Sequence, residues 1–474
     1  MKKKFNIFIC GALTALNVFG ASITQLITTP SQQVLLEWTE PAHPDSDGFE
    51  LLTSTNLSDS IWSPAGGHDE WPGSATNWSE DISAPSTFYK VNHVSRGTVT
   101  DAQMLGIIDT TNLVNICEYY GVPTNLVTYC VAAVTINYST FDARHISTNA
   151  SGLLIMPVGI DSFPQPPAEI PAISLLHGTM FANEEVPSVR HVYGEGLAGA
   201  LLASSGYAVC MPDYPGFGAS SGTHPYLHAR SEATSAVDMM RAALFVLESY
   251  TELPQPNGQL FIAGYSQGGH ATLALQKELE QNHADEFPLT ASAPMAGPHD
   301  LSGVMKPLIF SGESYNYPAY IPYVILGLNS VYSFGTITDF FNEPYASTLP
   351  PLFDGNHYGY EINDQMPAVP REIFTETFIN EVKSDENHPF AAALRKNDTY
   401  RDWVPTTPTC FFHCASDTIV PYSNSVTAMN AFIEAGASTN LVSLFDPYPA
   451  GDHSDGFFPC LQAAKLWFDS FLAP

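Results

Sequence analysis

The sequence predicts an α/β protein with a mostly parallel central sheet that is covered by helices on both faces. Short, almost continuously apolar runs at 172–176, 207–211 and 259–264 alternate with longer segments of helical periodicity. Parallel strands are buried on both faces and are usually connected by helices, so this alternation is typical of them. The last run leads into GYSQGG at 264–269, a pattern typical of a sharp strand-to-helix turn.

The first 22 residues have the three parts of a secretory signal peptide. Lysines at 2–4 precede an apolar stretch at 5–19, and small residues follow at 20–22. The stretch is short for a membrane span. We therefore leave residues 1–22 out of the fold prediction and expect a secreted or periplasmic protein, with a retained N-terminal anchor as the alternative.

Residues 23–95 predict a separate small β-sandwich. Short alternating runs, for example at 34–38 and 87–92, are separated by Pro, Gly, Asp and Ser. The early Trp38 and the late run at 88–91 resemble a fibronectin type III-like module. Such a module favours contact with a polysaccharide or a surface. Its other tryptophans suit sugar binding, but we interpret them as packing residues: Trp62, Trp71 and Trp78.

Residues 96–474 carry the predicted sheet and its helices. Between about 301 and 403 the regular alternation stops, and the chain is rich in Tyr, Phe and Pro. We expect this segment to be a helical insertion that caps an apolar pocket; a cap that serves stability alone is the alternative. The expected helices are 105–120, 196–205, 231–249, 268–279, 423–435 and 460–472, and the further strands are 129–139, 150–157, 289–296, 409–414 and 441–445.

Charge and cysteine content exclude some classes of protein. The formal net charge of −31 repels nucleic acid and anionic lipid, so we expect no nucleic-acid partner. The six cysteines after the leader are an even number for an oxidising compartment, so one or more disulfides are expected. Cys410 and Cys414 lie too far apart along one strand to bond to each other. No cysteine or histidine has zinc-ligand spacing, and we expect no metal.

Ser266 is the candidate nucleophile, because the glycines around it permit the strained turn that exposes its hydroxyl. A serine hydroxyl is a poor nucleophile and needs a base and an acid that orients the base. In this kind of fold the order along the chain is Ser, acid, His. Asp417 follows the strand at 409–414, and His453 lies after the last strand. Together they complete the predicted triad.

Other residues compete for both roles. Asp446 and Asp452 are alternatives to Asp417, but they come after the strand that is expected to carry the acid. His299 and His413 are alternatives to His453. His270, four residues after the serine, is interpreted as packing beside the nucleophile.

An oxyanion hole is the third requirement of acyl transfer. We expect one donor to be the backbone N–H of Gln267, just after the nucleophile. The second is expected from the loop after 172–176, at Thr179, with Met180 as the alternative. The side chain of His177 is expected to brace this loop, and Asp213 is interpreted as a structural turn residue.

These motifs together resemble the α/β-hydrolase superfamily, in particular secreted lipases and esterases of the Candida lipase A-like kind. The resemblance extends from about residue 129 to the end of the chain, and it implies a serine esterase without a cofactor and with a helical lid. The N-terminal β-module departs from that group, which does not require it. The motifs lie at 136–140, 151–157, 177–179, 213–218, 264–270, 416–417, 420–421 and 452–453.

The combined prediction is an exported carboxylic-ester hydrolase that acts through an acyl-enzyme on a small-molecule or polymer-linked ester. One alternative is a serine peptidase of the same fold, which would need acidic residues to hold a peptide N-terminus; Glu184 and Glu185 are the nearest candidates. The other is a non-catalytic binding protein, which would have a broken triad. The sequence leaves the acyl chain and the alcohol part of the substrate open.

Overall fold

The computed structural model describes residues 88–472 without a break and several strands before them. These strands form a four-stranded sheet, in the order β1-β7-β4-β5, and a three-stranded sheet, in the order β2-β3-β6. The predicted packing of the fibronectin-like module lies outside the described residues. The predicted signal peptide lies outside them as well, apart from the two residues of β1. The same holds for the side chains of Trp62, Trp71 and Trp78. The strands are β1 (Phe8–Ile9), β2 (Ile23–Thr28), β3 (Gln33–Trp38), β4 (Asp47–Ser54), β5 (Ser63–Pro64), β6 (Asn77–Asp81) and β7 (Phe88–Ser95).

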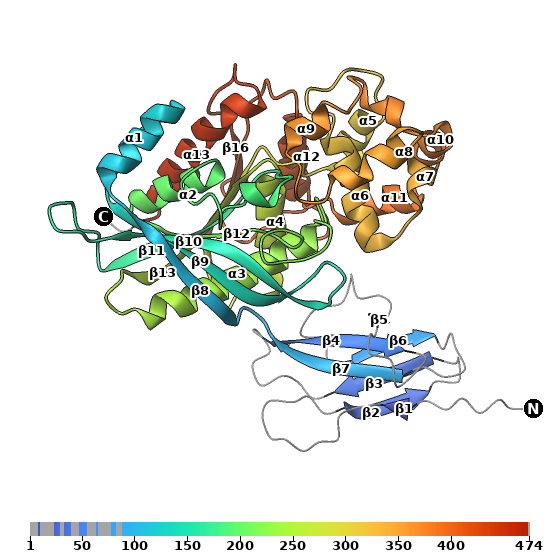
Figure 1. Ribbon diagram of the computed structural model, residues 1–474, viewed down its shortest axis with the longest axis horizontal. Coiled ribbons are helices and arrows are strands. Elements are labelled where there is room, and N and C mark those ends of the chain that lie inside the picture. Colours follow the sequence, from blue (N-terminus) through green and yellow to red (C-terminus); the bar gives the residue numbers. More distant parts are fainter. Residues whose placement is uncertain are drawn as a thin grey trace, which may run out of the picture.

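A nine-stranded sheet forms the centre of the protein (Figure 1), in the order β16-β15-β14-β13-β11-β12-β10-β9-β8. The six strands from β11 to β16 run parallel, and β8, β9 and β10 are antiparallel to their neighbours. The predicted fold class is therefore confirmed. The strands are β8 (Val99–Ile108), β9 (Cys130–Phe141), β10 (Ser147–Val158), β11 (Glu169–Leu176), β12 (Ala208–Pro212), β13 (Gln255–Tyr265), β14 (Leu289–Met295), β15 (Thr409–Phe412) and β16 (Val442–Phe445).

Helices cover both faces of this sheet because its strands are apolar on both sides. Ile173 and Leu175 of β11 belong to an apolar cluster with α1, α2 and α13 on one face. Ser174, which lies between them and points to the other face, is fully buried too. A second cluster joins the opposite face to α3 and α4. The helices are α1 (Thr110–Tyr120), α2 (Glu195–Ser204), α3 (Ala229–Ser249), α4 (Gln267–Asn282), α12 (Ser423–Glu434) and α13 (His453–Asp469).

Two helix predictions had wrong boundaries. The helix expected at 105–120 begins only at Thr110, because residues up to Ile108 pair with β9 and Asp109 caps the helix through its carboxylate. The helix expected at 460–472 begins earlier, at His453, with Asp452 as its N-cap. Pro459 lies inside this helix, at a position that normally indicates a helix boundary.

The segment between β14 and β15 consists of short helices, and it packs around an aromatic core of its own. Four phenylalanines are buried there, and the ring centroids of neighbouring pairs lie 5.3 to 5.8 Å apart: Phe310, Phe374, Phe378 and Phe390. In Figure 1 these helices lie together beside one end of the sheet. They are η3 (Leu301–Met305), α5 (Lys306–Ile309), α6 (Tyr320–Tyr332), α7 (Ile337–Phe340), α8 (Tyr345–Thr348), α9 (Gly359–Asn363), α10 (Glu376–Ser384) and α11 (Pro389–Lys396).

The expected disulfides are absent among the described residues. All six cysteines from Cys117 to Cys460 are free and buried, so the inference from their even number was wrong. Most lie on separate elements of the sheet and its helices, where they pack as small apolar side chains. Cys410 and Cys414 are unbonded, as predicted from their spacing.

Phe261 tests how far the elbow strand depends on this core. Its ring is fully buried, and its centroid lies 4.6 Å from that of Phe468 on α13. We expect Phe261→Ala to lower the free energy of unfolding by about 3–5 kcal/mol, because it leaves a cavity between sheet and helix. Phe245→Ala is the control, since that ring is 61% exposed. Denaturant unfolding would refute the assignment if both variants lost equally little stability.

Candidate active site

Ser266 lies in the turn between β13 and α4 with a strained backbone. Its φ of 60° and ψ of −120° are rare for a residue with a side chain. The turn packs so closely on β11 that a Cβ on Gly264 or Gly268 would lie 2.5 or 2.0 Å from the carbonyl oxygen of Leu176. The N–H of Ser266 donates to Met295 O over 2.9 Å. Glycines are therefore required where the notably tight turn meets the neighbouring strand.

The structure brings Ser266, His453 and Asp417 together. The Oγ of Ser266 lies 2.8 Å from Nε2 of His453, and Nδ1 of the same ring lies 2.6 Å from Oδ2 of Asp417. His453 is the first residue of α13, and Asp417 lies in the loop after β15. Since the partner of Nδ1 is a carboxylate, Nδ1 carries the proton and Nε2 is free to accept the serine hydrogen.

Asp417 is held as an anion by its surroundings. Burial alone would raise the pKa of its carboxyl, but hydrogen bonds from His413 and His453 outweigh burial and lower the pKa to about 2. The N–H groups of Ile419 and Val420 also donate to its Oδ1, over 2.9 and 2.8 Å. The carboxylate is therefore ionised and fixed in orientation across the neutral pH range.

The competing residues have other contacts. Asp446 accepts from the N–H of Ala415, and Asp452 accepts from Thr418 and caps α13. These two carboxylates hold the loops that carry Asp417 and His453. The ring of His299 bonds to Thr399.

His413 has a place that the sequence did not indicate. Its Nδ1 lies 2.8 Å from Ser425 Oγ, and its Nε2 lies 3.2 Å from Asp417 Oδ2. The fully buried ring therefore contacts the same carboxylate oxygen as His453 and helps to orient it.

The two expected oxyanion donors come from the start of α4 and from the loop after β11. The N–H of Gln267 is at the first position of α4, where a helix offers it no carbonyl partner. Thr179 follows β11, and its hydroxyl lies 2.8 Å from the hydroxyl of Tyr226. Met180, the alternative, is buried, and its carbonyl accepts from Tyr323.

The side chain of His177 braces the loop before Thr179. Nδ1 of the fully buried His177 lies 2.7 Å from the carbonyl oxygen of Gly178, and its Nε2 lies 3.2 Å from that of Asp213. The carboxylate of Asp213 accepts from Ser151 and from the N–H of Ser188. Asp213 thus connects three segments, which agrees with its interpretation as a structural residue.

A buried charge network lies under the elbow helix, and sequence reasoning missed it. Glu232 of α3 is fully buried, and its two oxygens accept from Gln267 Nε2 and His270 Nδ1, each over 2.8 Å. The other ring nitrogen of His270 lies 2.9 Å from Asn397 O. Both partners of His270 are acceptors, so the fully buried ring connects Glu232 of α3 to the Asn397 carbonyl. A glutamate in a buried register of α3 was the available signal.

His224 completes this network beside Gln267. Burial lowers the pKa of His224 to about 4, so its ring is neutral near pH 7. Its Nδ1 bonds to Pro215 O, which leaves Nε2 to accept from Gln267 at 2.8 Å. Glu232 and His224 therefore both bind the side-chain amide nitrogen of Gln267, the residue after Ser266.

A small apolar cavity of about 30 Å³ opens beside Ser266. Its walls come from the nucleophile side, from the loop at Ile419 and Val420, and from the helical segment between β14 and β15. Tyr226 forms part of the wall and stacks on Tyr323, with ring centroids 4.4 Å apart. The residues of the segment that line it are Leu301, Met305, Ile309, Tyr315, Tyr320, Ile321 and Val324.

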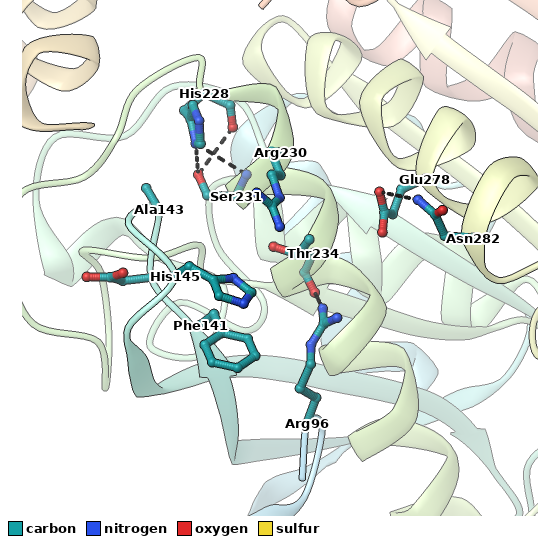
Figure 2. A pocket seen from close by; sticks show the side chains of 11 residues that line it. Arg96, Phe141, Ala143, His145, His228, Arg230, Ser231, Thr234, Glu278 and Asn282 are labelled. Atoms are coloured by element: carbon teal, nitrogen blue, oxygen red, sulfur yellow. Dashed lines mark hydrogen bonds between the residues drawn. The ribbon is translucent and has the colours of Figure 1, made fainter. Parts of the chain in front are cut away.

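A second, polar pocket lies away from Ser266 (Figure 2). It reaches Glu278 and Asn282 on α4, some 12 to 16 residues or about 18–24 Å along the helix from the nucleophile. Several of the polar groups that Figure 2 shows are bonded to one another: Arg96 to the Thr234 carbonyl, His228 to Ser231, and Asn282 to Glu278. The apolar cavity, which adjoins Ser266, is therefore the candidate site.

Fold and site define an α/β-hydrolase with a nucleophile turn and a capping insertion, a class of enzymes that includes lipases and esterases. The family model described as "Secretory lipase" matches residues 195–446, just over half of the chain. The chain belongs to this family. It is therefore a carboxylic-ester hydrolase, as the sequence predicted.

Solved structures agree with this assignment. A rice cell wall degrading esterase, LipA from Xanthomonas oryzae, is similar over 80% of this chain and 100% of its own, with 27% identity and a TM-score of 0.70. A putative hydrolase from Legionella pneumophila is similar over 79% of this chain and 98% of its own, with 26% identity and a TM-score of 0.70.

Lipase A from Candida antarctica is similar in fold, over 80% of this chain and 84% of its own, with 18% identity and a TM-score of 0.56. None of the curated proteins matches the chain. Within the described residues, no helix has both the length and the apolar character that a bilayer crossing requires.

Glu232→Ala tests the network under the elbow. The change leaves two buried groups, Gln267 Nε2 and His270 Nδ1, without the carboxylate that they share, so we expect the free energy of unfolding to fall by about 3 kcal/mol. Glu248→Ala on the same helix is the control, since that carboxylate is exposed. Equal melting temperatures for the two variants would contradict a stabilising role of these buried hydrogen bonds.

Proposed function

We propose that the protein is a secreted serine ester hydrolase in which Ser266, His453 and Asp417 form the catalytic triad. One observation supports this above all: an unbroken chain of hydrogen bonds joins serine, imidazole and carboxylate over 2.8 and 2.6 Å. The three residues lie at the carboxyl end of the parallel strands, where α/β enzymes carry their sites. This intact arrangement speaks against a non-catalytic binding protein.

In the proposed mechanism, Ser266 Oγ attacks the ester carbonyl while Nε2 of His453 takes its proton. The ionised Asp417 stabilises the imidazolium that forms. The N–H groups of Gln267 and Thr179 stabilise the negative charge on the tetrahedral intermediate. His453 then gives the proton to the leaving alcohol. Water attacks the acyl-enzyme by the same route, and no cofactor takes part.

The apolar cavity supports a substrate with an apolar acyl group of limited length. Its lining is almost entirely aliphatic and aromatic, and the capping segment closes it on one side. The alcohol part remains outside this cavity. Because one similar protein is a cell wall degrading esterase, we propose that the alcohol part belongs to a polysaccharide, with the N-terminal strands as a second contact.

Two observations bear on export and on the peptidase alternative. The family is that of secretory lipases, which supports the proposed signal peptide at 1–22. Glu184 is bonded to the hydroxyl of Tyr358, and Glu185 accepts from the N–H groups of Phe181 and Ala182. Both carboxylates are thus engaged within the protein, which favours esters over peptides.

Ser266→Ala removes the proposed nucleophile. We expect turnover of p-nitrophenyl butyrate to fall by a factor of about a million, since removal of a triad serine has that effect in related chemistry. Labelling by a fluorophosphonate probe should vanish, while the melting temperature stays near that of the wild type. Ser249→Ala, on the exposed end of α3, is the control. Ester turnover above a tenth of the wild-type rate in pure variant protein would rule out the assignment.

Val324→Phe tests the acyl site, because Val324 of α6 lines the cavity. The phenyl ring is larger than the valine side chain and should fill the space that a longer acyl chain needs. We therefore expect kcat/KM for the octanoate ester to fall about tenfold or more. The acetate ester is the internal control and should be hydrolysed as by the wild type. Wild-type preference across acetate, butyrate, octanoate and palmitate esters would place the acyl chain elsewhere.

A further inference from the structure

We propose that Glu195 is a positioning residue for the oxyanion hole: its carboxylate fixes the peptide of Gly178, so that the next N–H, that of Thr179, is directed toward the reacting carbonyl. This inference rests on the proposed function. It assigns a role in that reaction to a side chain outside the triad, on a different helix from the nucleophile.

The geometry at Gly178 carries the inference. Both carboxylate oxygens of Glu195 lie 2.8 Å from the backbone nitrogen of Gly178, so a single N–H is shared by the two oxygens. Charge-assisted hydrogen bonds of this kind are stronger than neutral ones. A Cβ on Gly178 would lie 2.5 Å from Oε1 of Glu195, so the contact also requires glycine at this position.

Thr179 is thereby held on two sides. Glu195 holds the residue before it through the backbone, and Tyr226 holds its hydroxyl at 2.8 Å. The N–H of Thr179 makes no hydrogen bond within the described part of the chain. A donor contributes to catalysis only if it is already in place when charge develops, because reorganisation during the reaction costs energy. The two contacts supply that preorganisation.

The surroundings of Glu195 make this an unusual place for a glutamate. It is the first residue of α2, and it lies within electrostatic range of Glu185, Tyr214 and Tyr320. Burial raises its pKa to about 7; the Gly178 N–H lowers it, and the charge of Glu185 raises it. Folding therefore binds a proton at Glu195 between its ordinary pKa and about pH 7, and the ionised carboxylate lowers stability above that range.

A carboxylate whose ionised form costs stability is expected to be retained for function. If Glu195 served the fold alone, Glu195→Gln would lower the melting temperature. If it positions the loop, Glu195→Gln should leave the melting temperature at pH 8 unchanged or higher, because the neutral amide removes a partly desolvated charge, and it should slow catalysis.

The test compares Glu195→Gln with Glu184→Gln in the full-length protein. Glu184 lies in the same loop region and is exposed, so its change removes the same charge without touching Gly178. For Glu195→Gln we expect kcat for p-nitrophenyl butyrate at pH 8 to fall about tenfold, a fraction of the loss seen when an oxyanion donor is deleted. KM should stay the same, and Glu184→Gln should match the wild type.

Two further readouts separate positioning from a general defect. Affinity for a trifluoromethyl ketone, whose adduct with serine carries an oxyanion, should weaken by the same factor as kcat. The difference between wild type and Glu195→Gln should narrow below pH 6, because Glu195 itself is then neutral and resembles the amide. Comparing the two proteins at each pH cancels the titration of His453, which they share.

The outcomes are distinguishable. A wild-type protein that hydrolyses no ester, or that is matched by Ser266→Ala, overturns the proposed function. An active wild type with an inactive Ser266→Ala, but an unchanged or higher kcat in Glu195→Gln, overturns the role of Glu195 alone. A higher kcat would mean that repulsion between Glu195 and the oxyanion outweighs positioning. A fall in melting temperature with unchanged inhibitor affinity would also overturn it.

Discussion

The strained backbone at Ser266 is the constraint on which the site depends. A non-glycine residue at φ 60° costs about 1–3 kcal/mol and persists only where its surroundings determine it. Here the Ser266 N–H is bonded to Met295 of β14, and Gly264 and Gly268 lie against the Leu176 carbonyl of β11. The strands on both sides of β13 therefore set the position of the Ser266 hydroxyl. The other groups of the site are arranged around this hydroxyl.

Three carboxylates, two of them buried and that of Glu195 half-buried, hold the surrounding pieces in place, each in a different way. Asp417 is satisfied by two histidines and two backbone N–H groups and stays ionised. Glu232 is paired with His270 and fixes Gln267. Glu195 has a single backbone N–H between its oxygens. Buried charge is costly unless it is paired, so the first two contribute to the fold, while the third lowers its stability at alkaline pH.

The sequence predicted the parts that local pattern determines. Apolar runs placed the parallel strands, and the glycines around Ser266 indicated the turn because they report backbone conformation directly. The order Ser266, Asp417, His453 followed from the motifs, and the structure places these side chains within bonding distance. Glu195 and Glu232 were not identified, because their partners lie 17 to 38 residues away and nothing local distinguishes them from exposed glutamates. The helix start at His453 was missed since Pro459 indicates a boundary that the structure does not have.

The sheet and the insertion contribute different parts of the candidate site. Ser266, Gln267 and Thr179 lie on connections of the sheet, where backbone geometry is fixed by strand pairing. Most of the cavity wall, in contrast, comes from the segment between β14 and β15, whose core is separate from the cores of the sheet. Side chains there can change without moving the reacting atoms. Tyr226 is the point of contact between the two parts, because it bonds to Thr179, stacks on Tyr323 of α6 and lines the cavity. A substrate that displaces Tyr226 would therefore disturb the oxyanion loop, which couples acyl fit to catalysis.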